Sequence, residues 1–175
     1  MDEPSLRARL QEARQLMDQN RLDEADIILK EIIHCNPKCD VALLRLGRIA
    51  HGQGDTVKGE SLYRRAIEVN PTCSAALNNL GVIYKEKGDL REAEALYRKA
   101  IDANRDNYAA INNLAILHRN RGDMKEAETL YLRALRIYPD FVESLYNIGA
   151  LYESQRRVSD AVDYYQRAAR LGRGG

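Results

Sequence analysis

Residues 74–107 read SAALNNLGVIYKEKGDLREAEALYRKAIDANRDN, and this stretch decides the fold. Apolar residues recur at spacings of three and four over 74–87, a pattern that predicts one apolar stripe along a helix. The same spacing over 90–103 predicts a second helix. Between the two, Gly88 is suited to end the first helix and Asp89 to cap the second. We therefore predict a helical hairpin.

The hairpin pattern returns every 34 residues along the chain. One column holds only small residues: Ala13, Gly47, Gly81, Ala115 and Gly149. Another column holds one leucine and four tyrosines: Leu29, Tyr63, Tyr97, Tyr131 and Tyr165. Self-similarity at this period is typical of helix–turn–helix solenoids. We therefore predict an all-α fold in which residues 1–175 form a single α-solenoid domain of five repeats, at about 6–39, 40–73, 74–107, 108–141 and 142–175.

The column of small residues predicts close packing inside each hairpin. Glycine in the middle of a helix costs about 1 kcal/mol relative to alanine, so a repeated glycine needs a repeated gain. We expect that gain from a close approach of the first helix to the second. There the small residues would face Ala93, Ala127 and Ala161, and the tyrosine column would fill the space beyond.

Prolines mark the joints between repeats. Pro37, Pro71 and Pro139 follow the second helix of their repeats, and proline disfavours the helical state in the residue before it. Arg105 and Arg173 stand where proline would be expected, so those two helix ends are predicted to be less sharply defined.

Composition argues against several classes of protein. The 27 Lys and Arg nearly balance the 26 Asp and Glu, without the basic excess of a nucleic-acid-binding protein. No apolar run reaches the roughly 18 residues that a membrane helix needs. The first residues lack the apolar segment of a secretory signal, and three cysteines fit a reducing compartment. We therefore expect a cytoplasmic protein that contacts neither nucleic acid nor the membrane interior.

The repeat columns resemble the tetratricopeptide repeat (TPR) family over about residues 6–172. In the third repeat, the family's signature columns hold Leu77, Leu80, Gly81, Tyr84, Ala93, Tyr97 and Ala100. The resemblance implies a right-handed superhelix whose concave face is lined by the first helix of each repeat. It also implies a protein–protein interaction scaffold that is not an enzyme.

Asparagine recurs at the same period just before the small column, as Asn79, Asn113 and Asn147. These three residues resemble the asparagine ladder in the TPR superhelix of O-linked N-acetylglucosamine transferases, which implies that they hold an extended peptide by its backbone. Packed helices lie roughly 8–10 Å apart and a strand advances about 3.3 Å per residue, so one asparagine would meet about every third peptide residue. Each amide offers both donors and an acceptor to a peptide unit. The alternative is that these polar residues only solvate an exposed helix face.

Further residues are expected on the open face of the first helices, and we assign peptide binding to five of them: Asn78, Asn112, Arg45, Arg48 and Tyr146. Together with Arg7 and Arg14, the two groove arginines make the N-terminal half of the groove basic, so the acidic groups of a ligand would lie there. Solvated surface charge is an equally good interpretation. The resemblance also raises the carboxylate clamp of chaperone-binding TPR domains, a mode that Arg45, Arg48 and Asn79 match only in part.

Motifs for catalysis, metal binding or a cofactor are not evident in the sequence. There is no nucleophile elbow, phosphate-binding loop or zinc-protease helix. His34, Cys35 and Cys39 lack a fourth metal ligand, so we interpret the cysteines as structural thiols. His118 stands in the tyrosine column of the first helices and is expected to be packed or hydrogen-bonded, while Glu94 is expected on the solvated side of its helix.

Three functional hypotheses follow. The first is a non-catalytic scaffold that binds an extended peptide in the concave groove. The second is a substrate-presenting TPR arm of a larger enzyme or assembly, such as a glycosyltransferase. The third is an adaptor that uses its outer face or its ends, with end-to-end self-association between copies of the chain.

Overall fold

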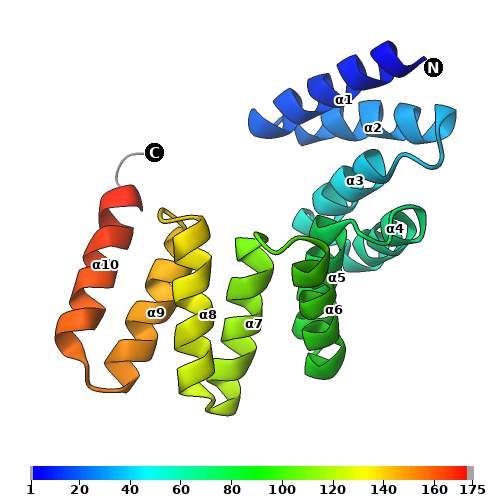
Figure 1. Cartoon of the computed structure of the whole chain (residues 1–175). Coiled ribbons are helices and arrows are strands. Elements are labelled where there is room, and N and C mark those ends of the chain that lie inside the picture. The colour runs from blue at the N-terminus through cyan, green and yellow to red at the C-terminus, as the bar shows by residue number, and fades with distance from the viewer. Residues whose placement is uncertain (1, 173–175) are drawn as a thin grey trace. The chain divides into compact units, whose positions relative to one another are not determined.

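The computed structural model describes residues 2–172, which form ten α-helices and no strand (Figure 1). The predicted all-α solenoid fold is confirmed. The chain divides into two compact units, Met1–Lys87 and Gly88–Gly175, and each is described by itself. The helices are α1 (Glu3–Asp18), α2 (Leu22–Cys35), α3 (Asp40–Gly52), α4 (Thr56–Val69), α5 (Ser74–Glu86), α6 (Leu90–Ala103), α7 (Tyr108–Arg121), α8 (Met124–Ile137), α9 (Val142–Ser154) and α10 (Val158–Gly172).

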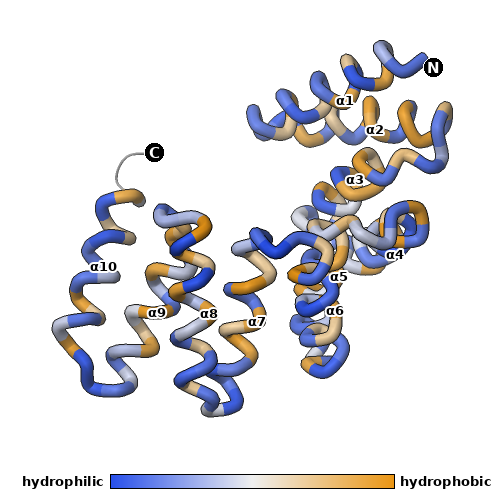
Figure 2. Tube along the Cα trace, viewed as in Figure 1, coloured by the Kyte–Doolittle hydropathy of each residue, from blue (hydrophilic) through white to orange (hydrophobic). Residues whose placement is uncertain are grey.

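The N-terminal unit consists of the hairpins α1–α2 and α3–α4, followed by α5. Consecutive helices pack on one another, and α3 also contacts α5. Apolar positions alternate with polar ones along each helix, as Figure 2 shows, and the apolar faces meet in a continuous core. Leu29, Ile32 and Leu43 are completely buried there. This packing fixes which face of α1, α3 and α5 remains accessible.

The C-terminal unit begins with α6, which packs on α7, and continues with the hairpins α7–α8 and α9–α10. Helices α7 to α10 lie side by side in chain order (Figure 1). The fully buried side chains Ile111, Leu145 and Leu151 lie in its interior. The first helices of the repeats, α7 and α9, also contact each other directly.

The turns inside the hairpins form as the sequence predicts. Gly54, Gly88 and Gly122 have φ values of +87°, +84° and +89°, a region that favours glycine. Asp89 then caps α6, because its carboxylate accepts a hydrogen bond from the backbone N–H of Glu92 at 3.3 Å. The third repeat therefore has its helices at Ser74–Glu86 and Leu90–Ala103, within one residue of the expected bounds.

The small column is explained by the tyrosine column. A Cβ atom built on Gly47 would lie 2.7 Å from Cε1 of Tyr63, and one on Gly149 would lie 2.7 Å from Cε1 of Tyr165. Both separations are shorter than a carbon–carbon contact allows. The expected close approach is confirmed, but the expected neighbour is corrected: the tyrosine ring does not lie beyond a facing alanine and is itself the group closest to the missing side chain.

The joint at Arg105 is as sharply defined as those with proline, so that expectation is wrong. Helix α6 ends at Ala103, in the same register as α4, which ends at Val69. The amide oxygen of Asn104 accepts a hydrogen bond from the backbone N–H of Asp106 at 3.0 Å, as Asn70 does from Thr72 at 3.1 Å. This asparagine turn ends the helix whether or not proline follows.

Two further expectations from the sequence concern the helix end at Arg173 and the membrane. Arg173 and the last residues of the fifth repeat lie outside residues 2–172. Within those residues, every helix is too short or too polar to traverse a lipid bilayer.

Candidate functional site

In the N-terminal unit, the groove arginines lie on α3 and face α1. Arg45 is half-buried, and its Nη1 donates a hydrogen bond to the backbone carbonyl of Leu10. Burial lowers the pKa of Arg45, and the neighbouring charges of Arg14 and Arg48 lower it further. The three guanidinium groups therefore lie close enough to repel one another. Arg7 points elsewhere, because it pairs with Glu3 on the exposed side of α1.

The same arginines line a pocket of about 470 Å³ between the C-terminal half of α1 and α3. Arg14 and Asp18 border it from α1, Arg45 and Arg48 border it from α3, and Leu22 contributes apolar surface. The pocket is thus strongly basic.

Asn79 is held in place on α5. Its side-chain oxygen accepts a hydrogen bond from Nδ2 of Asn78 at 3.2 Å, and its amide is also hydrogen-bonded to the hydroxyl of Tyr63. Asn79 is half-buried, so one side of the amide remains accessible. Burial raises the pKa of Tyr63 to about 12, against the opposing effects of Arg48 and Asn79, so this hydroxyl is neutral at physiological pH.

In the C-terminal unit, Asn112 ties two repeats together. Its amide oxygen accepts a hydrogen bond from Oγ of Ser144 at 2.8 Å and another from Nδ2 of Asn147 at 3.2 Å. Asn147 on α9 is half-buried. Asn113 on α7 is also half-buried and engages a neighbouring group of its own.

The expected positions of two asparagines need correction. Only 8% of the Asn78 surface and 4% of the Asn112 surface are exposed, so neither side chain lies open for a ligand. Their amides instead hold the asparagines of the ladder, Asn79 and Asn147. The sequence did not distinguish the two roles, because both residues of each Asn-Asn pair have the same chemistry.

Tyr131 occupies the position in α8 that Tyr63 occupies in α4, but its hydroxyl has a different environment. The side chain is fully buried, and its hydroxyl has no hydrogen-bond partner among residues 2–172. The pKa of Tyr131 is raised to about 12 because of this burial. Asn147, which is spaced from Tyr131 as Asn79 is from Tyr63, donates its amide to Asn112.

Tyr146 is an exposed member of the predicted binding residues, with 48% of its surface accessible. Its ring lies 6.0 Å from the ring of Tyr165 on α10, at an interplanar angle of 43°. Tyr146 therefore presents an aromatic surface on the same helix as Asn147.

Glu94 is not on a solvated face, which corrects the expectation for this residue. It is 9% exposed and pairs with Arg98 and with Arg121, each at 2.5 Å. Burial alone would raise the pKa of Glu94, but the hydrogen bond from Arg121 and the charge of Arg98 outweigh it and hold this pKa below its usual value. The pair joins α6 to the end of α7.

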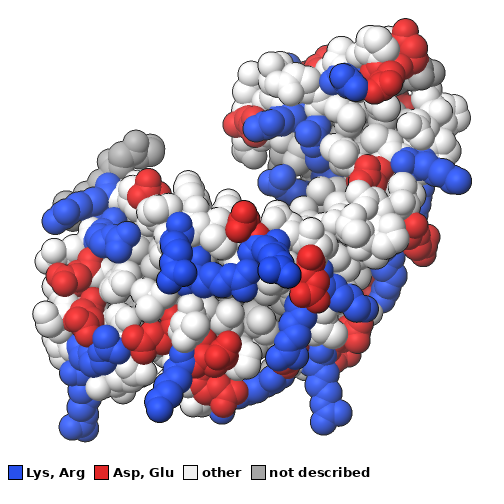
Figure 3. Space-filling view, viewed as in Figure 1, with Lys and Arg blue, Asp and Glu red and all other residues white. Residues whose placement is uncertain are grey.

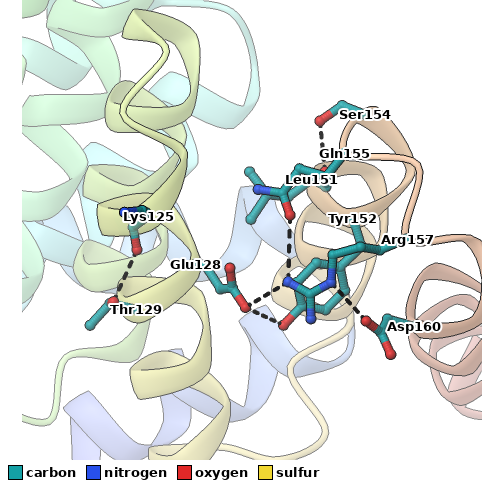
Figure 4. A network of polar contacts seen from close by, with 9 residues as sticks. All are labelled: Lys125, Glu128, Thr129, Leu151, Tyr152, Ser154, Gln155, Arg157 and Asp160. Carbon is teal, nitrogen blue, oxygen red and sulfur yellow. Dashed lines mark hydrogen bonds and ion pairs between the residues drawn. The ribbon is translucent and has the colours of Figure 1, made fainter.

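Equivalent carboxylates link the other repeats. Glu60 pairs with Arg64 and with Lys87. Glu128 accepts hydrogen bonds from the Tyr152 hydroxyl at 2.9 Å and from Nη1 of Arg157 at 3.1 Å, while Arg157 also lies over the Tyr152 ring (Figure 4). Glu60, Glu94 and Glu128 are separated by one period, and that spacing was the sequence signal for these contacts.

The other candidates from the sequence form no site. Within residues 2–172, no three His, Cys, Asp or Glu side chains come together to hold a metal ion. Cys39 is buried, while Cys35 is exposed, and all three cysteines are free thiols. His118 is half-buried, with Nδ1 3.3 Å from Oδ2 of Asp123, so the expected hydrogen-bonded histidine is confirmed.

Comparison with known proteins gives a consistent result. Two family models described as tetratricopeptide repeat match the chain, one at residues 79–140 and 112–175, the other at residues 39–106. No curated protein matches.

Solved structures extend the similarity in fold to nearly the whole chain. The structure from a study of Pseudomonas aeruginosa PilF is 18% identical, covers 99% of this chain and 78% of its own, and has a TM-score of 0.83. PilW, described as a widely conserved type IV pilus biogenesis factor, is 20% identical over 99% and 80% of the chains, with a TM-score of 0.82. YrrB, described as a TPR protein with an unusual peptide-binding site, is 15% identical over 95% and 86%, with a TM-score of 0.63.

Proposed function

The chain belongs to the tetratricopeptide repeat family, and from this premise we propose that it is a non-catalytic scaffold that binds an extended peptide through Asn79, Asn113 and Asn147. The observation that supports this most directly is the fixed orientation of the ladder amides. Asn79 is held by Tyr63 and Asn78, and Asn147 is held by Asn112.

Such fixed amides are suited to recognise a peptide backbone. A side chain that is already ordered loses little conformational entropy when the ligand arrives. An asparagine amide has two donors and an acceptor with two lone pairs, so even the two scaffold bonds of Asn79 leave one donor and one lone pair for a peptide C=O and N–H. Contacts of this kind read the backbone, so sequence selectivity would come from neighbours such as Tyr146 and Arg48.

The similarity to YrrB supports the same class of function, since that protein is described as having a peptide-binding site. We also propose a cytoplasmic location, which the free thiols Cys35, Cys39 and Cys73 support.

The test uses a peptide selected from a random dodecapeptide display library on the intact chain. We expect the triple variant Asn79→Ala, Asn113→Ala, Asn147→Ala to bind this peptide at least about tenfold more weakly, a loss of about 1.4 kcal/mol, as measured by fluorescence anisotropy. The matched control removes three exposed amides outside the ladder: Gln15→Ala, Gln53→Ala and Gln166→Ala.

A second measurement distinguishes contacts to the backbone of the peptide from contacts to its side chains. Methylation of single backbone nitrogens in the peptide should weaken binding at about every third residue, because each ladder amide then loses one hydrogen bond. Equal affinity of the triple variant and the control variant would refute the ladder.

A further inference from the structure

The pocket between α1 and α3 is lined by more positively charged than negatively charged side chains. Three guanidinium groups border it, from Arg14, Arg45 and Arg48, and Asp18 is the one carboxylate among its lining residues. Oδ2 of Asp18 is 3.8 Å from Nε of Arg14, and both side chains are largely exposed. The pocket therefore has a formal excess of two positive charges.

Part of this charge, the guanidinium of Arg45, is fixed in position. Arg45 on α3 donates a hydrogen bond to the backbone carbonyl of Leu10, which holds its guanidinium group against α1. Arginine remains protonated at any physiological pH, so the repulsion among the three groups cannot be relieved by loss of a proton. An anion bound among them would relieve it. In Figure 3, basic side chains gather on this part of the N-terminal unit.

We propose that this pocket binds the phosphoryl group of a phosphoserine or phosphothreonine in the peptide ligand, an inference that rests on the proposed function. A phosphoryl group carries a charge of about −1.5 to −2 at pH 7, which matches the excess in the pocket, whereas one carboxylate would leave a positive charge uncompensated. Its oxygens also accept paired hydrogen bonds from guanidinium groups. Asn79 lies on α5, which contacts α3, so the peptide backbone has a contact in the same unit.

Three degenerate peptide libraries test the assignment, identical except for a central phosphoserine, glutamate or serine. On the immobilised intact chain at low salt, we expect the phosphoserine library to be retained at least about tenfold more than the serine library, with glutamate much closer to serine. The double variant Arg14→Gln, Arg48→Gln should lower retention of the phosphoserine library at least about tenfold more than it lowers retention of the serine library, so that the difference between the two libraries disappears. Arg45 is left intact because it also bonds α1.

The control variant Lys58→Gln, Arg65→Gln removes the same charge from an exposed face of α4 in the same unit, and it should behave as the wild type. Equal retention of all three libraries, or an equal loss in both double variants, would overturn the phosphoryl assignment while the serine library still reports on the proposed function. Asn79→Ala should lower retention of all three libraries by a common factor. If no library binds, the proposed function fails as well.

Inorganic phosphate distinguishes the two sources of this chemistry. We expect it to compete with the phosphoserine library only at millimolar concentrations, because it lacks the backbone contacts. If inorganic phosphate binds as tightly as the phosphopeptide pool, then the pocket serves a free anion and the peptide assignment is wrong.

Discussion

Tyr63 and Tyr131 occupy the same column two repeats apart, and both side chains are buried, but their hydroxyl groups differ in surroundings. The Tyr63 hydroxyl is bonded to Asn79, whereas the Tyr131 hydroxyl has no hydrogen-bond partner among the residues described. A buried polar group without a partner costs its full desolvation penalty, and a paired one does not. The two positions are therefore a matched pair for measuring the value of one hydrogen bond.

We predict that Tyr131→Phe raises the free energy of unfolding by about 1 kcal/mol, because it removes a desolvated hydroxyl without leaving a cavity. Tyr63→Phe should lower it by about 1 kcal/mol, because the Asn79 amide loses its partner. Urea unfolding at pH 7 measures both values. Equal changes in the two variants would contradict the difference in surroundings.

Glu94 shows how a buried carboxylate contributes to stability. Its pKa is below the usual value of 4.5 because Arg121 and Arg98 outweigh the effect of burial. A carboxylate with a lowered folded-state pKa stabilises the fold above its unfolded pKa, and this stabilisation disappears as the pH falls through the folded-state pKa.

We predict that Glu94→Gln lowers the free energy of unfolding by about 2 kcal/mol at pH 7, since it leaves Arg121 without its counter-charge. The difference from the wild type should shrink as the pH falls below 4.5. Denaturant unfolding between neutral and acidic pH measures it. Glu92→Gln on the exposed side of the same helix is the control, and a difference that stays constant with pH would contradict the assignment.

At the scale of single residues, the sequence was only a partial guide to the site. The 34-residue period located Asn79, Asn113 and Asn147, but it could not show that Asn78 and Asn112 point inward. Burial of a polar side chain depends on partners in another repeat, such as Ser144 for Asn112, and a column of similar residues does not reveal those partners.

At the scale of the element, helix bounds were predictable because each turn has its own chemistry. Glycine with positive φ closes three of the hairpins, and asparagine turns end α4 and α6. The first and last hairpins lack this glycine. There Asn20 and Arg156 adopt φ values of 60°, which is costly for a residue with a Cβ and a long side chain.

We predict that Arg156→Gly raises the free energy of unfolding by about 1 kcal/mol, because glycine adopts the left-handed conformation without steric cost. Asn20→Gly should have a smaller effect, because asparagine tolerates this region. The midpoint of thermal unfolding, followed by circular dichroism, measures both variants. A lower midpoint for Arg156→Gly than for the wild type would contradict the prediction.

At the scale of the whole molecule, the fold was predictable and the ligand was not. The period determines which residues pack inside the hairpins, so the core of each unit follows from the repeat columns alone. The charges of the chain are nearly balanced, and basic and acidic side chains alternate over much of the face in Figure 3. The amino-acid composition therefore does not indicate which class of partner the chain binds. Our proposals assign selectivity to a few side chains such as Arg14 and Arg48, and only the folded chain brings these two residues to one pocket.

One whole-molecule prediction concerns contact between copies of the chain. Helix α10 exposes Val158 at 64% and Val162 at 44%, one turn apart on the same side of the helix. Solenoids end in repeats with a polar outer face, and apolar side chains on such a face favour stacking on a further repeat. We therefore predict that the weight-average mass of the chain rises with concentration in sedimentation equilibrium.

The variant Val162→Lys places a charge in that face and should keep the chain monomeric at every concentration, because a buried unpaired ammonium group opposes association. Val57→Lys on α4 is the matched control, since Val57 is 79% exposed and lies far from α10 in sequence. It should associate as the wild type does. A wild-type chain that remains strictly monomeric at high concentration would refute end-to-end association, and loss of association in both variants would show that net charge, rather than the α10 face, controls it.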